Sequence, residues 1–380
     1  MKVLLVNYLE TTFPGGISKT VNELAQNLSK NHEVTVLQPN PSNLMAEEAN
    51  NGFKIIRVSS ALDNTKYFYG LNFEIYKYLK NHYKDLNPDI VHVHGYHHLM
   101  PIESIHIIKR MDPNVPIIFS PYLDVARGRL AGKYLWNLYN IFARTVFSKS
   151  ASITSCSNFE SANIQNIGVE REKITVIPLG VDEINLKKSR KDKNSKKTIN
   201  ILYTGHIIPR KGVDYILKSL HSLVHKKGAD NVVLTVVGDG PEKNKLIKMA
   251  EELEIADHIN WMSFLSREEL IDLIKESDIY MLLSRSEAYG IAVAEALAMG
   301  TPCVISNSTA LTEFSNEIGC YAVDYPPVPD DVADTVLKIY AEDMGVGPLS
   351  ERIRTWNEVS KDYENLYRSV VSANKIDEYQ

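Results

Sequence analysis

Short apolar runs alternate with longer amphipathic stretches along the chain, and this rhythm constrains the fold more than any other feature. The runs are continuous rather than alternating, which is typical of strands buried on both faces of a sheet. Strands separated by helices indicate a doubly wound parallel sheet, because parallel neighbours need a crossover connection. The first series comprises predicted strands at Val3–Asn7, Val34–Gln38, Lys54–Val58, Ile90–His94, Ile117–Ser120, Ile153–Cys156 and Lys173–Ile177, and helices at Ser18–Ser29 and Phe73–Tyr83.

The same alternation begins again after residue 197. Two Rossmann-like α/β halves are therefore predicted, each a doubly wound parallel sheet. Because such sheets bind ligands at the carboxyl ends of their strands, we expect the ligand in a cleft where the halves face each other. The second series comprises strands at Thr198–Thr204, Val232–Gly238, Asp278–Leu283 and Pro302–Ser306, and helices at Val213–Lys226, Glu242–Leu253, Arg267–Glu276 and Ala292–Met299.

A basic stretch separates the two series. Seven of the eleven residues 187–197 are Lys or Arg, which is typical of a solvated loop and of a domain boundary. We predict a first domain at residues 1–183, a linker at 184–197, and a second domain at 198–360. A final helix is predicted at 361–380, and its return to the first domain is left open.

Composition excludes several classes of protein. With 380 residues, 44% of them hydrophobic and a net charge of −5, the chain fits two soluble domains better than a general nucleic-acid binder. Its cysteines, Cys156, Cys303 and Cys320, are widely spaced and favour a reducing compartment over a disulfide scaffold or zinc site. No apolar run is long enough to span a membrane, and the N-terminal VLLVN predicts a buried strand rather than a signal peptide. We expect a cytoplasmic protein.

Glycine-rich loops follow several predicted strands. Residues 14–16, Pro-Gly-Gly, open a helix whose N–H groups favour an anion. Residues 237–241, Val-Gly-Asp-Gly-Pro, resemble the start of a dinucleotide fingerprint, but Lys243 stands where the third glycine belongs. We predict a turn that lines the cleft there, not an NAD site. A tight strand–helix turn also requires glycine. Residues 14–16 are therefore either a ligand-binding loop or only a tight turn, and both interpretations stay open.

Two further loops carry charged residues. Residues 205–212 follow the first strand of the second half, and the adjacent cations Arg210 and Lys211 suit a diphosphate, although a basic turn before a helix is the alternative. In residues 284–295, Glu287 lies in a loop and Glu295 in the first turn or so of a helix. A carboxylate can accept hydrogen bonds from two hydroxyl groups at once, and proteins hold the diols of ribose and other sugars in this way.

Together with Val-Ile-Pro-Leu-Gly-Val-Asp at residues 176–182, these stretches resemble the retaining glycosyltransferases of family 4, which have the two-domain GT-B fold. The resemblance implies that Lys211 contacts the donor diphosphate, Glu295 its ribose and Glu287 the transferred sugar. It implies further donor contacts at Gly15, Gly16, Gly205, His206, Arg210, Gly238, Ala288, Tyr289, Gly290 and Ile291.

Two positions depart from the family pattern. His206 replaces the usual arginine, and a neutral imidazole stabilises a diphosphate less than a guanidinium does. Tyr122 stands where the family often has a histidine near the reacting sugar, and a phenol is a poor base near pH 7. His94 ends a predicted strand on the same face as His92, so it is either a core histidine or a catalytic group at the cleft.

We predict a retaining transferase that moves a sugar from a nucleotide-sugar donor to a saccharide or lipid-linked acceptor, in polysaccharide or glycolipid biosynthesis. The catalytic candidates are Glu287, Lys211, Tyr122 and His94. No cofactor and no metal are expected, because no D-x-D motif lies at a strand end. Two alternatives stay open, a catalytically silent nucleotide-sugar-binding subunit and a sugar-nucleotide epimerase or hydrolase on the same fold.

Residues 125–149 raise the question of membrane contact. This stretch has no acidic residue, and its five cations stand among aromatic and aliphatic side chains. Such a mixture at helical spacing suits a headgroup interface, whereas packing of its apolar face on the first sheet is the alternative. Peripheral contact with the inner face of a membrane stays open. The cations are Arg127, Arg129, Lys133, Arg144 and Lys149.

Overall fold

The structure, a computed structural model, describes residues 1–13, 15–59, 73–123, 139, 141–186 and 198–377. Its contacts divide the chain into two compact units. The first comprises Met1–Gly180 and Trp356–Gln380, and the second comprises Val181–Thr355. The chain therefore crosses to the second unit after Gly180, and it crosses back before the last helix, which begins at Trp356 rather than at the expected residue 361. Most of the predicted linker, residues 187–197, lies outside the described residues.

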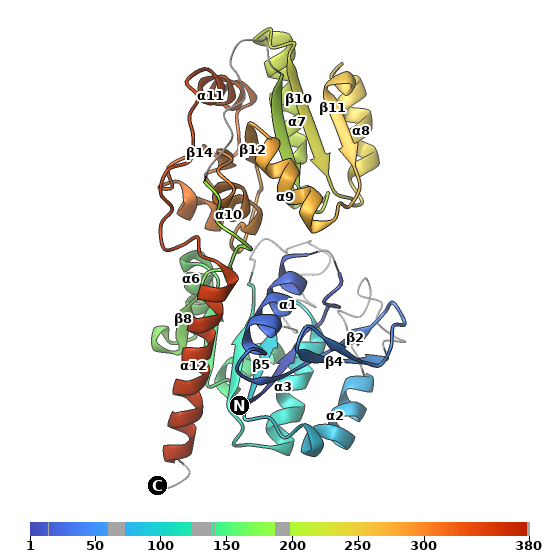
Figure 1. The fold of residues 1–380 in the computed structure, drawn as a ribbon, viewed down its shortest axis with the longest axis vertical. Helices are drawn as coiled ribbons and strands as arrows, with labels where there is room; N and C mark the ends of the chain where they lie inside the picture. Colours follow the sequence, from blue (N-terminus) through green and yellow to red (C-terminus); the bar gives the residue numbers. More distant parts are fainter. Residues whose placement is uncertain (14, 60–72, 124–138, 140, 187–197, 378–380) are drawn as a thin grey trace. The chain divides into compact units, whose positions relative to one another are not determined.

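The first unit is built on an eight-stranded sheet (Figure 1). In chain order its strands are β1 (Lys2–Val6), β2 (Glu33–Asn40), β3 (Glu47–Asn50), β4 (Phe53–Ser59), β5 (Ile90–His94), β6 (Ile117–Ser120), β7 (Ser152–Ser155) and β8 (Ile174–Val176). In the sheet they lie in the order β3-β4-β2-β1-β5-β6-β7-β8. All neighbours are parallel except β3, which pairs antiparallel with β4 at the edge. The sequence does not predict β3, because its four residues are mostly polar.

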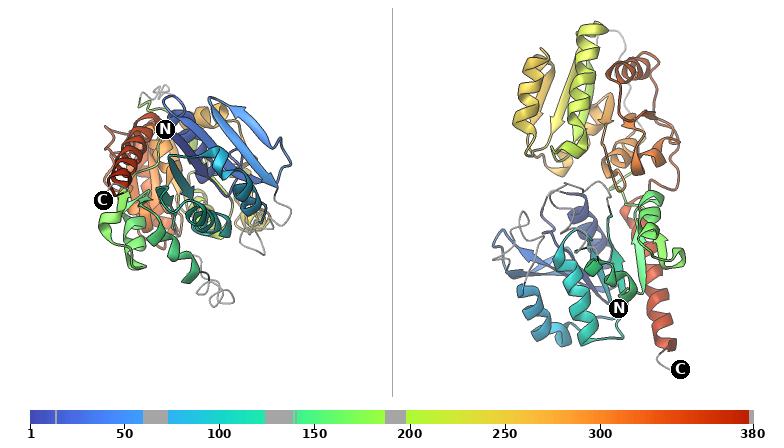
Figure 2. Two further views of the ribbon diagram at one scale, coloured as in Figure 1. Left: turned by 90° about the horizontal axis from the view of Figure 1, so that it is seen from below. Right: turned by 180° about the vertical axis from the view of Figure 1, so that it is seen from behind.

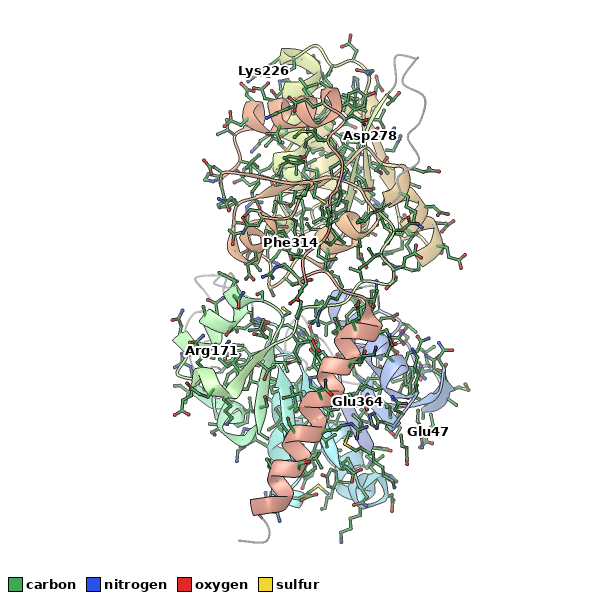
Figure 3. The ribbon with its side chains drawn as sticks, turned by 60° about the vertical axis from the view of Figure 1, so that its left-hand side comes forward. Glu47, Arg171, Lys226, Asp278, Phe314 and Glu364 are labelled. Atoms are coloured by element: carbon green, nitrogen blue, oxygen red, sulfur yellow. The ribbon has the colours of Figure 1, made fainter. Side chains whose placement is uncertain are left out.

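Helices cover this sheet, and the last of them comes from the far end of the chain. They are α1 (Gly16–Leu28), α2 (Phe73–Leu86), α3 (Leu99–Met111), α5 (Thr145–Lys149), α6 (Asn158–Asn166), the short 3₁₀ turn η2 (Arg171–Lys173) and α12 (Trp356–Asp377). Helix α12 lies beside α1 (Figures 1 and 2). There His32 Nε2 lies 3.1 Å from Glu364 Oε1, and Figure 3 labels Glu364 on α12. Tyr363 and Tyr367 of α12 are buried, so the returning helix completes the first unit's core.

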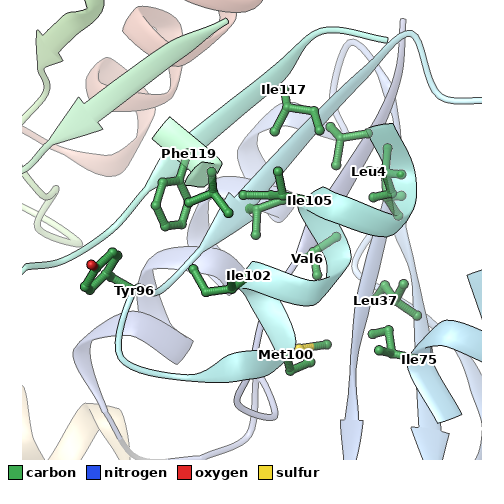
Figure 4. Packing of buried hydrophobic residues seen from close by; sticks show 14 of the residues in the cluster. Leu4, Val6, Leu37, Ile75, Tyr96, Met100, Ile102, Ile105, Ile117 and Phe119 are labelled. Carbon is green, nitrogen blue, oxygen red and sulfur yellow. The ribbon is translucent and has the colours of Figure 1, made fainter. Parts of the chain in front are cut away.

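Apolar side chains from the sheet and from α2 and α3 form one core cluster. Figure 4 shows Ile102 and Ile105 of α3, Phe119 of β6 and Val6 of β1 within this cluster. Burial of side chains of this size contributes about 1.5–3 kcal/mol each. The continuous apolar runs of the sequence are therefore explained by a sheet that is covered on both faces.

The second unit is built on a six-stranded, wholly parallel sheet. In chain order its strands are β9 (Ile199–Thr204), β10 (Val232–Val237), β11 (Ile259–Met262), β12 (Ile279–Leu282), β13 (Cys303–Ser306) and β14 (Cys320–Val323). In the sheet they lie in the order β11-β10-β9-β12-β13-β14. The sequence predicts the four inner strands. It does not predict the edge strands β11 and β14, which are short and partly exposed.

The helices and helical turns of the second unit follow in chain order. They are η3 (Pro209–Lys211), α7 (Val213–His221), the π turn η4 (Ser222–Lys226), α8 (Lys243–Glu252), η5 (Ala256–His258), α9 (Arg267–Glu276), α10 (Ile291–Ala298), η6 (Thr309–Phe314) and α11 (Pro329–Ala341). The four helices that the sequence predicts for this unit, now α7, α8, α9 and α10, begin within one residue of their predicted starts, whereas α11 is not predicted. Helix α9 has the predicted bounds, because Ser266 and Glu269 form a capping box at its start. Across the described residues of both units, we find no helix long and apolar enough to cross a membrane.

Candidate active site

Three loops of the second unit leave the sheet at the carboxyl ends of neighbouring strands β10, β9 and β12. Parallel strands all end at one edge, so these loops meet there. The backbone N–H of Gly205 donates to Val237 O at 3.0 Å, and that of Arg285 donates to Arg210 O at 2.7 Å. The structure thus joins the loops that the sequence predicts for the donor, including the turn at Gly238.

Gly212 allows the closest of these approaches. Its φ is +69°, and a Cβ atom placed there would come within 1.9 Å of Leu283 O. Any other residue would push the loop after β9 away from the end of β12. The glycine therefore brings Lys211 within reach of Glu287, which lies 76 residues further along the chain.

Glu287 lies at the centre of a charged cluster. Its side chain is buried, with Lys211 Nζ donating to Oε1 at 2.7 Å and Ser284 Oγ donating to the same oxygen at 2.7 Å. Arg210 Nη1 lies 3.6 Å from Oε2. Burial alone would raise the pKa of Glu287, but the charges of Lys211 and Arg210 outweigh burial and lower this pKa. With both cations charged, the cluster carries one net positive charge.

His206 adds no charge to this cluster at neutral pH. Its side chain is exposed at the start of the same loop. Partial burial of the ring, followed by the nearby charges of Lys211 and Arg210, lowers the pKa of His206, although Asp239 acts in the opposite direction. The substitution of the family's arginine therefore leaves the positive charge of this loop to Arg210 and Lys211.

Helix α10 begins at the end of the loop that carries Glu287. Its N-cap, Gly290, has a φ of +110°, and a Cβ atom there would lie 2.7 Å from Leu311 Cδ2. The first N–H groups of a helix, here from Ile291 onward, have no carbonyl partner within the helix and favour an anion. Of the two loop residues before the helix, Ala288 is half-buried, whereas Tyr289 is buried and donates its hydroxyl to Arg352 O at 2.9 Å. The predicted contact of Tyr289 with the nucleotide-sugar therefore falls to its backbone, because its side chain is already bonded elsewhere.

Glu295 does not join the cluster around Glu287. It is the fifth residue of α10, at the end of the first turn or so as predicted, and its side chain is buried. Arg267 Nη2 donates to Glu295 Oε1 at 2.6 Å, and Arg267 Nε donates to Asp182. The sequence analysis did not identify Arg267. The available signal was its charge, because a cation is unfavourable in the first turn of a helix.

In the first unit, the structure brings His94 and Tyr122 together. Both side chains are buried, and Tyr122 Oη lies 3.1 Å from His94 Nδ1. Burial lowers the pKa of His94 to about 3 and raises the pKa of Tyr122 well above its usual range. Both groups are therefore neutral at pH 7. When the Tyr122 hydroxyl donates to Nδ1, the His94 proton lies on Nε2, which is buried and has no hydrogen-bond partner among the described residues.

His92 is a core histidine. Its ring centroid lies 4.0 Å from that of His94, which confirms that both rings lie on one face of β5. Its Nδ1 lies 2.6 Å from Tyr367 Oη and its Nε2 lies 2.7 Å from Ser120 Oγ. These bonds tie the returning helix α12 to the sheet. The next two histidines, His97 and His98, are half-buried.

Glu160 is a buried carboxyl group that the sequence analysis also missed. Leu123 N donates to its Oε1 at 2.6 Å, and Cys156 N donates to its Oε2 at 2.7 Å. Burial is the largest influence and raises the pKa of Glu160 to about 7, although these bonds lower it. The signal in the sequence was a serine three residues before a glutamate, because Ser157 Oγ accepts the Glu160 N–H at 3.0 Å.

The remaining predicted features divide between described and undescribed residues. Gly15 is the N-cap of α1 and Gly16 its first residue, and both are exposed. Residues 125–138 lie outside the described residues. Within the described ranges, no group of three or more His, Cys, Asp or Glu side chains is arranged to hold a metal ion.

Comparison with known proteins decides the family. A family model described as "Glycosyltransferase Family 4" matches residues 14–183, and one described as "Glycosyl transferases group 1" matches residues 185–356. The chain belongs to the family 4 glycosyltransferases. An uncharacterized glycosyltransferase of Methanocaldococcus jannaschii is 26% identical to it over 308 residues, which are 74% of this chain and 75% of that protein.

Solved structures establish the fold of this glycosyltransferase. Sucrose-phosphate synthase of Thermosynechococcus elongatus matches with a TM-score of 0.80 and 16% identity, over 98% of this chain and 99% of the other. HepE of Anabaena, solved in complex with UDP-glucose, matches with a TM-score of 0.68 and 14% identity, over 99% and 97% of the two chains. The two parallel-sheet units therefore form the GT-B fold, as predicted.

Proposed function

We propose that this glycosyltransferase transfers a sugar from a nucleotide-sugar donor to a saccharide or lipid-linked acceptor with retention of anomeric configuration. The observation that carries the proposal is the cluster of Lys211, Arg210 and Glu287 at the carboxyl ends of the second unit's strands. Its net positive charge suits a nucleoside diphosphate. The UDP-glucose complex of the Anabaena protein supports a diphosphate donor.

Within this proposal, the diphosphate, the sugar and the ribose of the nucleotide-sugar each have partners in the protein. Lys211 has three N–H donors, so its bond to Glu287 leaves capacity for diphosphate oxygens. The backbone N–H groups at Gly290 and Ile291 contact the diphosphate or the sugar, as does the loop at Gly15 and Gly16. Glu287 accepts hydroxyls of the transferred sugar, and Glu295 accepts hydroxyls of the ribose.

The proposed chemistry needs no protein nucleophile. The bond between the sugar C1 and the diphosphate oxygen breaks while the acceptor oxygen bonds to C1 on the same face. The acceptor hydroxyl gives its proton to an oxygen of the departing diphosphate. Fixed positive charge stabilises this leaving group, and mutagenesis of such groups in enzymes typically changes kcat by about 10²–10³-fold. Neither a metal nor a cofactor takes part.

Tyr122 and His94 supply a neutral hydrogen-bond donor in this proposal rather than a base. Tyr122 Oη lies 3.1 Å from His94 Nδ1, and the pKa of each group is shifted by burial so that neither is charged at pH 7. This pair takes the place of the family's histidine.

The proposal extends to location. The protein is cytoplasmic, and residues 125–149 contact a membrane surface. Of this stretch, the structure describes Tyr139 and residues 141–149. Ile141 is 70% exposed and Phe142 is 45% exposed, next to the exposed cations Arg144 and Lys149. Apolar side chains beside cations suit anionic headgroups, which supports a lipid-linked acceptor.

A panel of UDP-, GDP- and ADP-sugars tests the function. We expect one nucleotide class to raise the Tm, because a ligand that binds the folded state stabilises it. With that donor and an acceptor, NMR of the product should show the donor's anomeric configuration. Hydrolysed or epimerised donor without any transfer would support the epimerase or hydrolase alternative. Binding without any turnover would support the silent subunit, and an inverted product would contradict retention.

A further inference from the structure

Glu295 is held by a cation that no motif predicts. Arg267 Nη2 donates to Glu295 Oε1 at 2.6 Å, and the two residues lie 28 positions apart on α9 and α10. The Arg267 side chain is 34% exposed and that of Glu295 is 9% exposed. A partly exposed guanidinium is therefore bonded to a nearly buried carboxylate.

A second carboxylate fixes the same guanidinium. Arg267 Nε donates to Asp182, in the Val-Asp step just after the chain enters the second unit. A planar guanidinium that is bonded through Nε and through Nη2 cannot rotate freely, so its position is set from two sides. The Glu295 carboxylate is held in one orientation as a result.

The location of Arg267 breaks a local rule, which is typical of functional positions. It is the first residue of α9, where the helix dipole favours acidic side chains, and Glu268 and Glu269 follow it there. Burial acts against the charge of Arg267, but Glu295 and Asp182 outweigh it and raise the pKa of the guanidinium. An arginine at this position is accounted for by its two carboxylate partners and not by the helix.

We propose that Arg267 is a positioning residue that orients Glu295 toward the donor ribose and thereby sets the preference for ribonucleotides over deoxyribonucleotides. This inference rests on the ribose role that the proposed function gives to Glu295. A carboxylate in a fixed orientation accepts the ribose hydroxyls well, whereas a mobile one gains less from them. Discrimination between ribose and deoxyribose is therefore the property that Arg267 controls.

Titration calorimetry with UDP, GDP and ADP, and with their 2′-deoxy and 3′-deoxy counterparts, tests the inference. The wild-type protein should bind its preferred ribonucleotide at least about tenfold more tightly than a deoxy counterpart, which corresponds to one charged hydrogen bond. Arg267→Ala should bring this ratio to within about threefold of unity by weakening the ribonucleotide. Arg267→Lys, which keeps the charge but not the two bonds, should give an intermediate ratio.

Lys275→Ala is a matched control. Lys275 lies on the same helix, is 33% exposed and donates to Glu183, next to Asp182, at 2.8 Å. Its removal should leave the ratio unchanged. Asp182→Asn, which retains Arg267 but weakens its second anchor, should lower the ratio partly.

The failure of each idea has its own result. If Glu295→Gln lowers the ratio and Arg267→Ala does not, the role of Arg267 is overturned while the ribose role of Glu295 stands. If Arg267→Ala weakens ribo- and deoxyribonucleotides equally, the arginine is merely structural. If Glu295→Gln leaves the ratio unchanged, the ribose role in the proposed function fails and the inference fails with it. Circular dichroism of each variant checks the fold, and Arg267→Lys keeps the test decisive if Arg267→Ala does not fold.

Discussion

Each unit buries a glutamate in its candidate site, and the two glutamates behave in opposite ways. Glu287 of the second unit has Lys211 at 2.7 Å and Arg210 at 3.6 Å, and these charges lower its pKa despite burial. Glu160 of the first unit is bonded by the backbone N–H groups of Leu123 and Cys156, and burial raises its pKa to about 7. Burial acts in the same direction on both carboxyl groups, so the difference between their pKa shifts comes from the neighbouring cations of Glu287.

In the proposed function, this difference matches the groups that each unit binds. Fixed charges in the second unit suit a diphosphate, which carries negative charge in both the donor and the leaving group. The first unit instead holds the neutral pair of His94 and Tyr122, and Glu160 binds the loop that carries Tyr122. Tyr122 has a φ of +50°, which is uncommon for a tyrosine. The Glu160 carboxyl group, bonded to the next residue, Leu123, helps hold this conformation.

Lys211→Ala is expected to have the largest effect, because it makes Glu287 more like Glu160. Removal of the ammonium takes away one of the two cations that lower the pKa of Glu287 and a donor for the diphosphate. We expect kcat/KM to fall by about 10²–10³-fold. Affinity for the nucleoside diphosphate should fall more than affinity for the nucleoside, as measured by calorimetry.

Lys218→Ala is the control for this change, since Lys218 lies in the next helix, 44% exposed and 3.9 Å from Asp214. It should retain wild-type activity. Equal losses of nucleoside and nucleotide affinity in Lys211→Ala would contradict a phosphate role for Lys211.

The pH dependence of stability tests the Glu160 half of the comparison. The pKa of Glu160 is about 7 in the folded protein and 4.5 as the ordinary value. Between these values the folded state binds more protons than the unfolded state, so the free energy of unfolding falls as the pH rises. The full loss, on the order of 3 kcal/mol, is present above pH 7.

Urea unfolding of the wild type and of Glu160→Gln between pH 4.5 and pH 8 measures this effect. For each protein the free energy of unfolding is plotted against pH, and the effect of Glu160 is the difference between the two slopes. Burial lowers the pKa of both His92 and His94, so these histidines act in the opposite direction, but they are common to both proteins. Parallel slopes for the two proteins would show that Glu160 titrates normally.

Tyr122→Phe tests whether the stability and activity of the first unit depend on the hydrogen bond between the neutral groups Tyr122 and His94. The change leaves Nδ1 of His94 buried without the phenol that lies 3.1 Å away. We expect the free energy of unfolding to fall by about 1–3 kcal/mol. We also expect kcat to fall with little change in the Kd of the donor. Wild-type kcat in a stably folded variant would remove Tyr122 from the catalytic candidates.

The smallest expected effect concerns the surface of the first unit. Reversal of Arg144 and Lys149 to Glu should weaken binding to anionic liposomes, since each cation contributes about 1 kcal/mol at low salt. Reversal of the exposed Lys77 and Lys80 on α2 provides a control of equal charge. If both double variants sediment like the wild type, residues 141–149 do not contact the membrane.

Much of the fold is predictable because its signals are local. The seven strands predicted for the first series and the four predicted for the second all exist, since continuous apolar runs mark strands buried on both faces. Helix α9 has its predicted bounds because its capping box lies within four residues. The loops at Lys211, Glu287 and Gly290 are predictable for the same reason, because each directly follows a strand. By contrast, β3, β11 and β14 are short edge strands that owe their form to one neighbour.

The sequence by itself thus determined the order of elements and which loops lie at the strand ends, because these depend on neighbours a few residues away. Tertiary structure decided which polar groups meet: Lys211 with Glu287 across 76 residues, Arg267 with Glu295 across 28 and with Asp182 across 85, and the backbone N–H of Leu123 with Glu160 across 37. No local pattern encodes such pairs, since they exist only after the sheets bring the loops together. The pKa shift of each buried carboxyl group depends on those pairs, because the two cations beside Glu287 outweigh the effect of burial, whereas the backbone N–H groups that bond to Glu160 do not.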